Sequence, residues 1–133
     1  MELDRLFEAA KRAQGHAYAP YSRFKVGAAL ATPGGAVFSG CNVENAAYPV
    51  GTCAEEAAIA AMVTAGEKGI AAILVLGEGE ALVTPCGACR QRLRQFAGPK
   101  TPIHIADLNH VRRSFRLDEL LPFSFGPDNL GSR

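Results

Sequence analysis

The sequence contains no tryptophan and only two methionines, aromatic residues make up 8%, and the formal net charge is +1. A chain this close to neutral lacks the basic surface that binds polyanions, so we expect no nucleic-acid partner. It also lacks an apolar run of membrane length, so no membrane role is expected. A basic-then-apolar leader is missing too, which favours a reducing, cytoplasmic compartment.

The chain has enough apolar material for one compact domain. It has 133 residues, of which 48% are hydrophobic. That length supports one core and not two, so we expect a single catalytic domain over residues 1–133.

Three of the four cysteines lie between Thr52 and Gln91. Cys86 and Cys89 form a C-x-x-C, and Pro85 is suited to a helix entrance, so both sulfurs would point the same way from a first helical turn. Cys53 precedes an alanine-rich run that predicts a second helix, capped by Thr52 or Cys53. Two converging helix N-termini would then hold three thiolates around one cation.

Three ligands indicate a catalytic metal site more than a structural one. A closed structural zinc site uses four protein ligands, whereas a catalytic site leaves one position open. Glu55 stands two residues after Cys53 and is suited to accept a proton from an activated water. Cys41 has no partner at metal spacing, and we expect it to be a small buried residue. Alone, the C-x-x-C would also fit a redox pair or half of a structural zinc site.

Periodicity predicts the surrounding fold. Residues 1–14 are expected to form an amphipathic helix that covers a sheet face. Residues 24–32 and 36–43 are expected to form a hairpin, 70–76 a buried strand and 103–106 another short strand. The strand–helix–strand crossover from Ile70 to Ile105 should be parallel. Together these elements predict an α/β fold, a mixed sheet between helices in an α/β/α sandwich.

The residues after Val111 give weaker signals. Arg112, Arg113 and Arg116 form a basic cluster that we interpret as a solvated edge. Residues 117–121 could form one or two helical turns, and two phenylalanines near Gly126 could anchor the tail on this chain or on another subunit.

Asn42, Glu44 and Asn45 follow the second hairpin strand. Two amides and a carboxylate suit a pocket for a hydroxyl-rich ligand, although, taken alone, an ordinary turn with side chains that cap backbone groups is the better explanation. Phe24, considered alone, is better explained by core packing.

With these motifs the chain resembles the small zinc-dependent cytidine deaminases of the homotetrameric type. The resemblance rests on the following segments: Pro20-Tyr21-Ser22, Phe24-x-Val26-Gly27-Ala28-Ala29, Asn42-Val43-Glu44-Asn45-Ala46-Ala47-Tyr48-Pro49, Cys53-Ala54-Glu55, Pro85-Cys86-Gly87-Ala88-Cys89-Arg90-Gln91 and Phe125-Gly126-Pro127. It implies a five-stranded mixed sheet and one Zn²⁺ per chain. It also implies the hydrolytic deamination of cytidine and 2'-deoxycytidine to uridine and 2'-deoxyuridine in pyrimidine salvage.

The same resemblance assigns the site residues. Cys53, Cys86 and Cys89 would hold zinc, and Glu55 would carry protons. The substrate-binding residues it implies are Phe24, Asn42, Glu44, Tyr48, Ala54 and Phe125. Asn42 and Glu44 would bind the ribose, while Phe125 and Tyr48 would act across subunit boundaries of a homotetramer with shared active sites.

The sequence departs from this family at Glu56. Three thiolates leave a zinc site with a formal charge of about −1, which opposes activation of a water. Three-cysteine relatives usually place an arginine at this position. We therefore expect Glu56 to face away or to pair with an arginine, and the two helix N-termini together with donors such as Arg90 or Gln91 to supply the compensation.

Other functions make different demands. A deaminase of aminonucleoside antibiotics would lack the Asn42 and Glu44 segment. A nucleic-acid deaminase would need a basic groove. A structural zinc module would need a fourth protein ligand and would give Glu55 no role.

Overall fold

The computed structural model describes residues 2–131 and is built around a five-stranded sheet with the spatial order β2-β1-β3-β4-β5. The strands are β1 (Val26–Ala31), β2 (Val37–Cys41), β3 (Ala72–Gly77), β4 (Pro102–Ala106) and β5 (Val111–Arg116). The helices are α1 (Glu2–Gly15), α2 (Ala54–Thr64), α3 (Gly87–Phe96) and α4 (Leu117–Leu120), with 3-10 turns η1 (Tyr48–Val50) and η2 (Pro127–Leu130).

The sheet is mixed, as the sequence predicts. β1 pairs antiparallel with both β2 and β3, and β5 pairs antiparallel with β4. β3 and β4 are parallel and are joined through α3, which confirms the expected crossover. The hairpin between β1 and β2 turns through Gly35, whose φ of 93° suits glycine.

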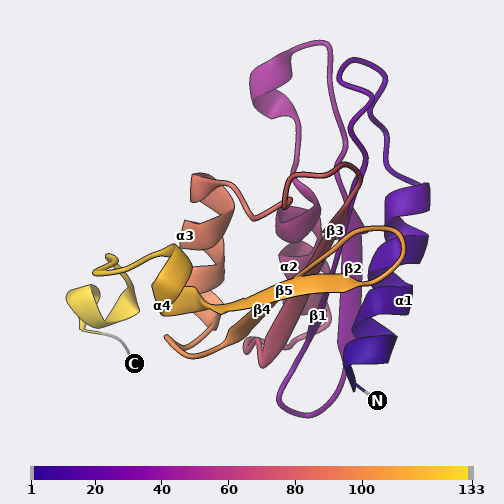
Figure 1. The fold of residues 1–133 in the computed structure, drawn as a ribbon. Coiled ribbons are helices and arrows are strands. Elements are labelled where there is room, and N and C mark those ends of the chain that lie inside the picture. The colour runs from indigo at the N-terminus through magenta and orange to yellow at the C-terminus, as the bar shows by residue number, and fades with distance from the viewer. Residues whose placement is uncertain (1, 132–133) are drawn as a thin grey trace.

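Helices cover both faces of the sheet, so the α/β/α sandwich is confirmed. α1 lies on one face, and α2 and α3 lie on the other (Figure 1). Alternate strand residues serve the two faces: Leu30 and Val75 pack in the α2 and α3 core, whereas Ala29 and Leu74 pack in the α1 core. A central strand buried on both sides explains the continuous apolar run in β3.

Two glycines let the helices approach the sheet closely. A Cβ atom at Gly27 would lie 2.6 Å from the backbone nitrogen of Gln14 in α1. One at Gly40 would lie 2.6 Å from the backbone nitrogen of Ala58 in α2. Both gaps are too small for a side chain. Gly40 therefore fixes how deeply α2, with Cys53 at its entrance, sits against the sheet.

Several expected boundaries shift. α1 begins at Glu2, while Met1 of the expected helix lies outside the described residues. The buried strand begins at Ala72 and not at Ile70, whose N–H instead donates to the Phe96 carbonyl at 3.0 Å. The short helical segment expected over residues 117–121 is confirmed as α4, which begins at Leu117.

The strand β5 is absent from the elements that periodicity predicted. Its residues carry the basic cluster, and the segment does lie at a sheet edge. Arg113 and Arg116 are exposed there, whereas Phe115 is half-buried. The pairing with β4 makes this segment a strand, and a pattern dominated by arginine conceals it.

Candidate active site

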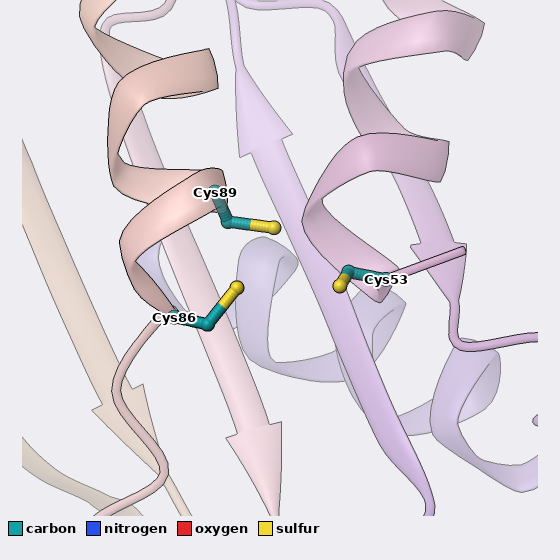
Figure 2. Close-up of side chains that lie close together, drawn as sticks. All are labelled: Cys53, Cys86 and Cys89. Atoms are coloured by element: carbon teal, nitrogen blue, oxygen red, sulfur yellow. The ribbon is translucent and has the colours of Figure 1, made fainter. Parts of the chain in front are cut away.

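Three cysteine sulfurs converge at the N-terminal ends of two helices. Cys53 is the N-cap of α2, Cys86 is the N-cap of α3, and Cys89 lies in the first turn of α3. Their sulfur atoms all lie within 4.8 Å of one another. Figure 2 shows the three side chains pointing from the two helices toward a common space.

The local prediction for α3 was wrong in one detail. Pro85 stands at the helix entrance as expected, but Cys86 does not lie in the first turn, because the helix begins at Gly87 and Cys86 is its cap. The cap residue is extended, with φ −67° and ψ 169°, and its sulfur still reaches the same space as that of Cys89. The expected convergence of the two sulfurs therefore holds, although its local cause differs.

The donor set fits zinc. Two sulfurs that share one zinc ion at ~2.3 Å are about 3.8 Å apart in a tetrahedral site and never more than about 4.6 Å apart. Here all three sulfur atoms lie within 4.8 Å of one another, a bound close to that maximum. Thiolates are soft ligands that select zinc over magnesium or calcium. In the part of the chain that the structure describes, no second group of His, Cys, Asp and Glu side chains has such spacing.

Cys41 lies outside this group. It ends β2, carries a free thiol and is half-buried, so the expectation that it is a buried residue was wrong. The group that could hold a metal ion therefore comprises three cysteines, a number that would leave one position of a four-coordinate zinc open.

The three thiols do not ionise equally. Burial raises the pKa of Cys53 and also that of Cys89, which lies close to the charge of Glu55. Burial acts the same way on Cys86, but N–H groups of Cys89 and Ala88 donate to its sulfur and bring its pKa below the ordinary value. The helix N-terminus thus favours one thiolate, and a bound dication would favour the other two.

Glu55 lies in the first turn of α2 and is only 5% exposed. Burial raises the pKa of this carboxyl group above its usual range. A raised pKa suits a carboxylate that must both accept and return a proton near neutral pH. Glu55 also lines the cavity next to Cys53 and Cys86, which is where a substrate would need it.

A cavity of about 570 Å³ opens beside the sulfurs. That volume is typical of sites for small organic ligands. Its lining brings together most of the residues expected to bind substrate: Phe24, Asn42, Glu44, Tyr48 and Ala54. Phe24 is 44% exposed and belongs to this lining, so core packing was the wrong explanation for it.

Asn42 braces the cavity wall. Its Nδ2 donates to the Phe24 carbonyl at 2.8 Å, and its Oδ1 accepts from the Val26 N–H at 2.9 Å. One N–H and one lone pair of the amide are left for a ligand after these bonds. The side chain therefore serves as structural support and retains capacity for substrate.

Glu44 holds the loop that precedes β1. Its Oε1 accepts from the backbone N–H groups of Tyr21 at 3.0 Å and Ser22 at 3.1 Å, and its Oε2 accepts from the Ser22 hydroxyl. That hydroxyl bond and the two backbone bonds lower the pKa of Glu44. A carboxylate accepts about four hydrogen bonds, so one position remains for a ligand hydroxyl.

The two residues expected to act across subunits are exposed. Tyr48 is 74% exposed and packs edge-on against Tyr21, with ring centroids 5.8 Å apart. Phe125 is 59% exposed and does not line the cavity of its own chain in the part that the structure describes. Its backbone carbonyl accepts from Gln91 Nε2 at 2.9 Å, so α3 fixes the tail while the ring faces outward.

The expectation for Glu56 is confirmed. The expectation that Arg90 or Gln91 would donate to the sulfurs is wrong. Glu56 Oε2 lies 3.7 Å from Nη2 of Arg92. Arg90 does not serve the sulfurs: it donates to the carbonyls of Pro85 and Leu120. Gln91 likewise donates elsewhere, to the backbone carbonyl of Phe125.

Sequence reasoning missed Arg92, Tyr21 and Ser22 as parts of the site. Arg92 follows Cys89 by three residues, a spacing that places both on one helix face, and this signal was available. Ser22 belongs to a motif that carried the resemblance, but only the fold shows that it meets Glu44.

Glu55 is buried beside three sulfurs that could hold a metal ion, and it lines a cavity large enough for a small ligand. This arrangement is typical of zinc-dependent hydrolytic enzymes. Residues 1–105 match the family model described as "Cytidine and deoxycytidylate deaminase zinc-binding region". The chain belongs to this family, and zinc is its metal.

Relatives match over nearly the full chain. A cytidine deaminase of Sporosarcina psychrophila is 37% identical over 130 residues, which cover 98% of this chain and 96% of that protein. One from Mycobacterium tuberculosis is 44% identical over 122 residues, covering 91% and 87%. The crystal structure of a cytidine deaminase from Burkholderia pseudomallei superposes with a TM-score of 0.88 at 45% identity, covering 94% of this chain and 100% of that one.

No helix within residues 2–131 has both the length and the apolar character needed to cross a bilayer.

Proposed function

We propose that this protein is a cytidine deaminase that hydrolyses cytidine and 2'-deoxycytidine to the corresponding uridines and ammonia, a reaction of pyrimidine salvage. The observation that carries the proposal is the position of Glu55. It is buried beside three sulfurs that can hold one metal ion, at the wall of a cavity large enough for a nucleoside. A structural zinc module has no use for a buried carboxylate at that position.

Cys53, Cys86 and Cys89 would hold one zinc ion, whose Lewis acidity makes water a nucleophile near neutral pH. Glu55 accepts the first proton from the attacking water and delivers it to the ring nitrogen N3. The water oxygen bonds to C4, the carbon that bears the amino group. Glu55 then moves the second proton from that oxygen to the amino group. The C4–N bond breaks, ammonia leaves and the uracil carbonyl forms.

The remaining lining orients the nucleoside. Asn42 and Glu44 each keep free hydrogen-bonding capacity on the cavity side of their structural bonds, which suits ribose hydroxyls. Phe24 offers an aromatic face, and the backbone at Ala54 lies at the α2 N-terminus close to Glu55. We assign the base to the end near Glu55 and the sugar to the end near Asn42 and Glu44.

The charge of the cavity favours a nucleoside over a nucleotide. Among the lining residues that the structure describes there is no lysine, arginine or histidine, while Glu44 and Glu55 are both acidic. A 5'-phosphate would meet a carboxylate without a compensating cation. The same reasoning disfavours a nucleic-acid strand.

We further propose that the chains assemble as a homotetramer with shared active sites, in the cytoplasm. The exposure of Tyr48 beside the cavity and of Phe125 on the tail supports the assembly. Four free thiols, three of them needed as metal ligands, support a reducing compartment.

An ultraviolet assay tests the function directly. Purified protein loaded with zinc should convert cytidine to uridine, recorded as the loss of cytidine absorbance and the release of ammonia. Treatment with a strong chelator should abolish turnover, and added zinc should restore it. Cytidine 5'-monophosphate is the comparison substrate and should react far more slowly. A zinc-loaded protein that leaves cytidine unchanged would refute the proposal.

A further inference from the structure

Arg92 and Glu56 join the two helices that carry the sulfurs. Arg92 Nη1 lies 3.6 Å from Cys89 Sγ, a donor contact to sulfur. Arg92 Nη2 lies 3.7 Å from Glu56 Oε2, and Glu56 Oε1 accepts from the Cys53 N–H at 3.3 Å. The connections therefore run from Cys89 on α3, through the guanidinium and the carboxylate, to Cys53 at the start of α2.

The formal charges at this site explain why a cation matters. Three thiolates around a zinc dication carry about −1, and Glu55 and Glu56 add further negative charge. Electron-rich thiolates weaken the ability of the metal to polarise a ligand. A positively charged donor on a sulfur withdraws part of that electron density and counters the excess charge.

Arg92 is suited to this role and poorly suited to a purely stabilising one. Its side chain is 39% exposed and that of Glu56 is 35% exposed, so their ion pair is accessible to solvent. Surface ion pairs of this kind contribute little to the free energy of folding. What the pair does provide is direction, because Glu56 restrains a long side chain that would otherwise extend into solvent.

We infer that Arg92 is the charge-compensating residue of the zinc site and that Glu56 positions it, so that the cation is supplied from the helix of Cys86 and Cys89 and not from the helix of Glu55. This rests on the proposed function only in assuming that the three cysteines bind metal. Arg92 acts through the sulfur of Cys89 and is not among the described residues that line the cavity.

Cobalt(II) in place of zinc makes the sulfur environment measurable. A donor to a thiolate lowers the energy of its lone pair, so removal of the donor should move the sulfur-to-cobalt charge-transfer band to longer wavelength. We compare Arg92→Met, which lacks charge and donors, with Arg92→Lys, which keeps the charge. Arg12→Met on α1, an exposed residue on the other side of the sheet, is the control for loss of one positive charge.

The expected result has three parts. Arg92→Met shifts the band to longer wavelength and, when loaded with zinc, lowers kcat about tenfold with little change in KM, equal to ~1.4 kcal/mol of barrier. Arg92→Lys and Arg12→Met stay close to wild type. The double variant Glu56→Arg with Arg92→Met returns the cation from α2 and moves both the band and kcat back toward wild type.

Two results would overturn the inference. One is a cobalt band in Arg92→Met identical to that of wild type at full metal occupancy. The other is an equal shift in Arg92→Met and Arg92→Lys, which would assign the effect to side-chain shape and not to charge. A third result would refute the proposed function alone. In it, wild type binds cobalt through its sulfurs and the Arg92 variants shift the band as expected, but the zinc-loaded wild type leaves cytidine intact.

Discussion

Ser22 donates two hydrogen bonds to the carboxylate of Glu44, one from its backbone N–H at 3.1 Å and one from its hydroxyl group. These two residues are 22 positions apart in the sequence, and their contact ties the loop before β1 into the cavity wall. The carboxylate thus shapes the wall of the site even before any ligand arrives.

Replacement of Glu44 by Gln should weaken substrate binding more than chemistry. The amide keeps one acceptor oxygen but cannot accept on its nitrogen, so either the Ser22 bond or the ligand bond is lost. An uncompensated polar contact of this kind costs about 1–3 kcal/mol, so KM for cytidine should rise roughly 5- to 150-fold. Steady-state kinetics should show a smaller change in kcat. A KM equal to that of wild type would exclude Glu44 from substrate binding.

The same carboxylate predicts a dependence of stability on pH. Hydrogen bonds from Ser22 lower the pKa of Glu44 in the folded protein. Its contribution to stability is therefore fully present above the ordinary carboxyl pKa of about 4.3, and it is lost as pH falls through the lower folded value. Urea unfolding in chelator should show that the advantage of wild type over Glu44→Gln at pH 7 shrinks toward pH 3. Glu8→Gln, in an exposed position on α1, controls for the loss of one carboxylate elsewhere.

Replacement of Glu55 by Gln should leave the metal in place and remove proton transfer. Turnover should fall by the ~10²–10⁴-fold typical of a lost general acid–base, at unchanged zinc content per chain. Kinetics combined with metal analysis on the same preparation makes the measurement. Near-normal turnover in this variant would show that the proton carrier lies elsewhere.

Metal analysis should distinguish Cys41 from the other cysteines. Wild type and Cys41→Ser should each hold about one zinc per chain, while serine at Cys53, Cys86 or Cys89 should lose most of it. The reason is geometric: Cys41 lies outside the group whose sulfurs are within 4.8 Å. Zinc loss in Cys41→Ser would indicate a closed site with four cysteine ligands.

Mixing of two impaired variants tests whether active sites are shared. Phe125→Ala should lower activity, since stacking of a base on an aromatic ring contributes roughly 1–3 kcal/mol in nucleic-acid binders. If the ring acts in a neighbouring subunit, mixing this variant with Glu55→Gln should regain activity, because some sites combine an intact Glu55 with an intact Phe125. Native mass spectrometry confirms the mixed assemblies. In the absence of any gain above the summed residual activities, each chain would hold a self-contained site.

The sequence was most informative where the chemistry is local. The spacing of Cys86 and Cys89, and of Cys53 and Glu55, lies within single helical turns, and these side chains do converge. Alternation and apolar runs likewise predicted four strands, because burial imposes a period on them. β5 was not predicted, because the residues of an exposed edge strand show no hydrophobic alternation. Its hydrogen bonding with β4 makes it a strand, and its own residues do not indicate one.

Contacts between distant segments could not be predicted from pattern. The pairing of Glu44 with Ser22 and of Glu56 with Arg92 depends on how loops and helices pack, and each of these charges has several possible partners in the sequence. Arg90 shows the difficulty, because its position beside Cys89 suggested a role at the sulfurs, whereas its guanidinium donates to the carbonyls of Pro85 and Leu120. Adjacency in sequence was a poorer guide than position on the helix face.

Hydrogen bonds fasten the tail to α3. Gln91 Nε2 donates to the Phe125 carbonyl and Arg94 donates to Ser124 at 2.9 Å, while the same helix begins at Cys86 and Cys89. The helix α3 therefore holds both the tail segment that carries the Phe125 ring and two of the three sulfurs, those of Cys86 and Cys89. In an assembly with shared sites, each chain would place its Phe125 ring in a neighbour's site, and α3 would set the position of that ring relative to the metal of its own chain. Tilting of α3 would then retune two catalytic centres at once, one within the chain and one in the neighbouring chain.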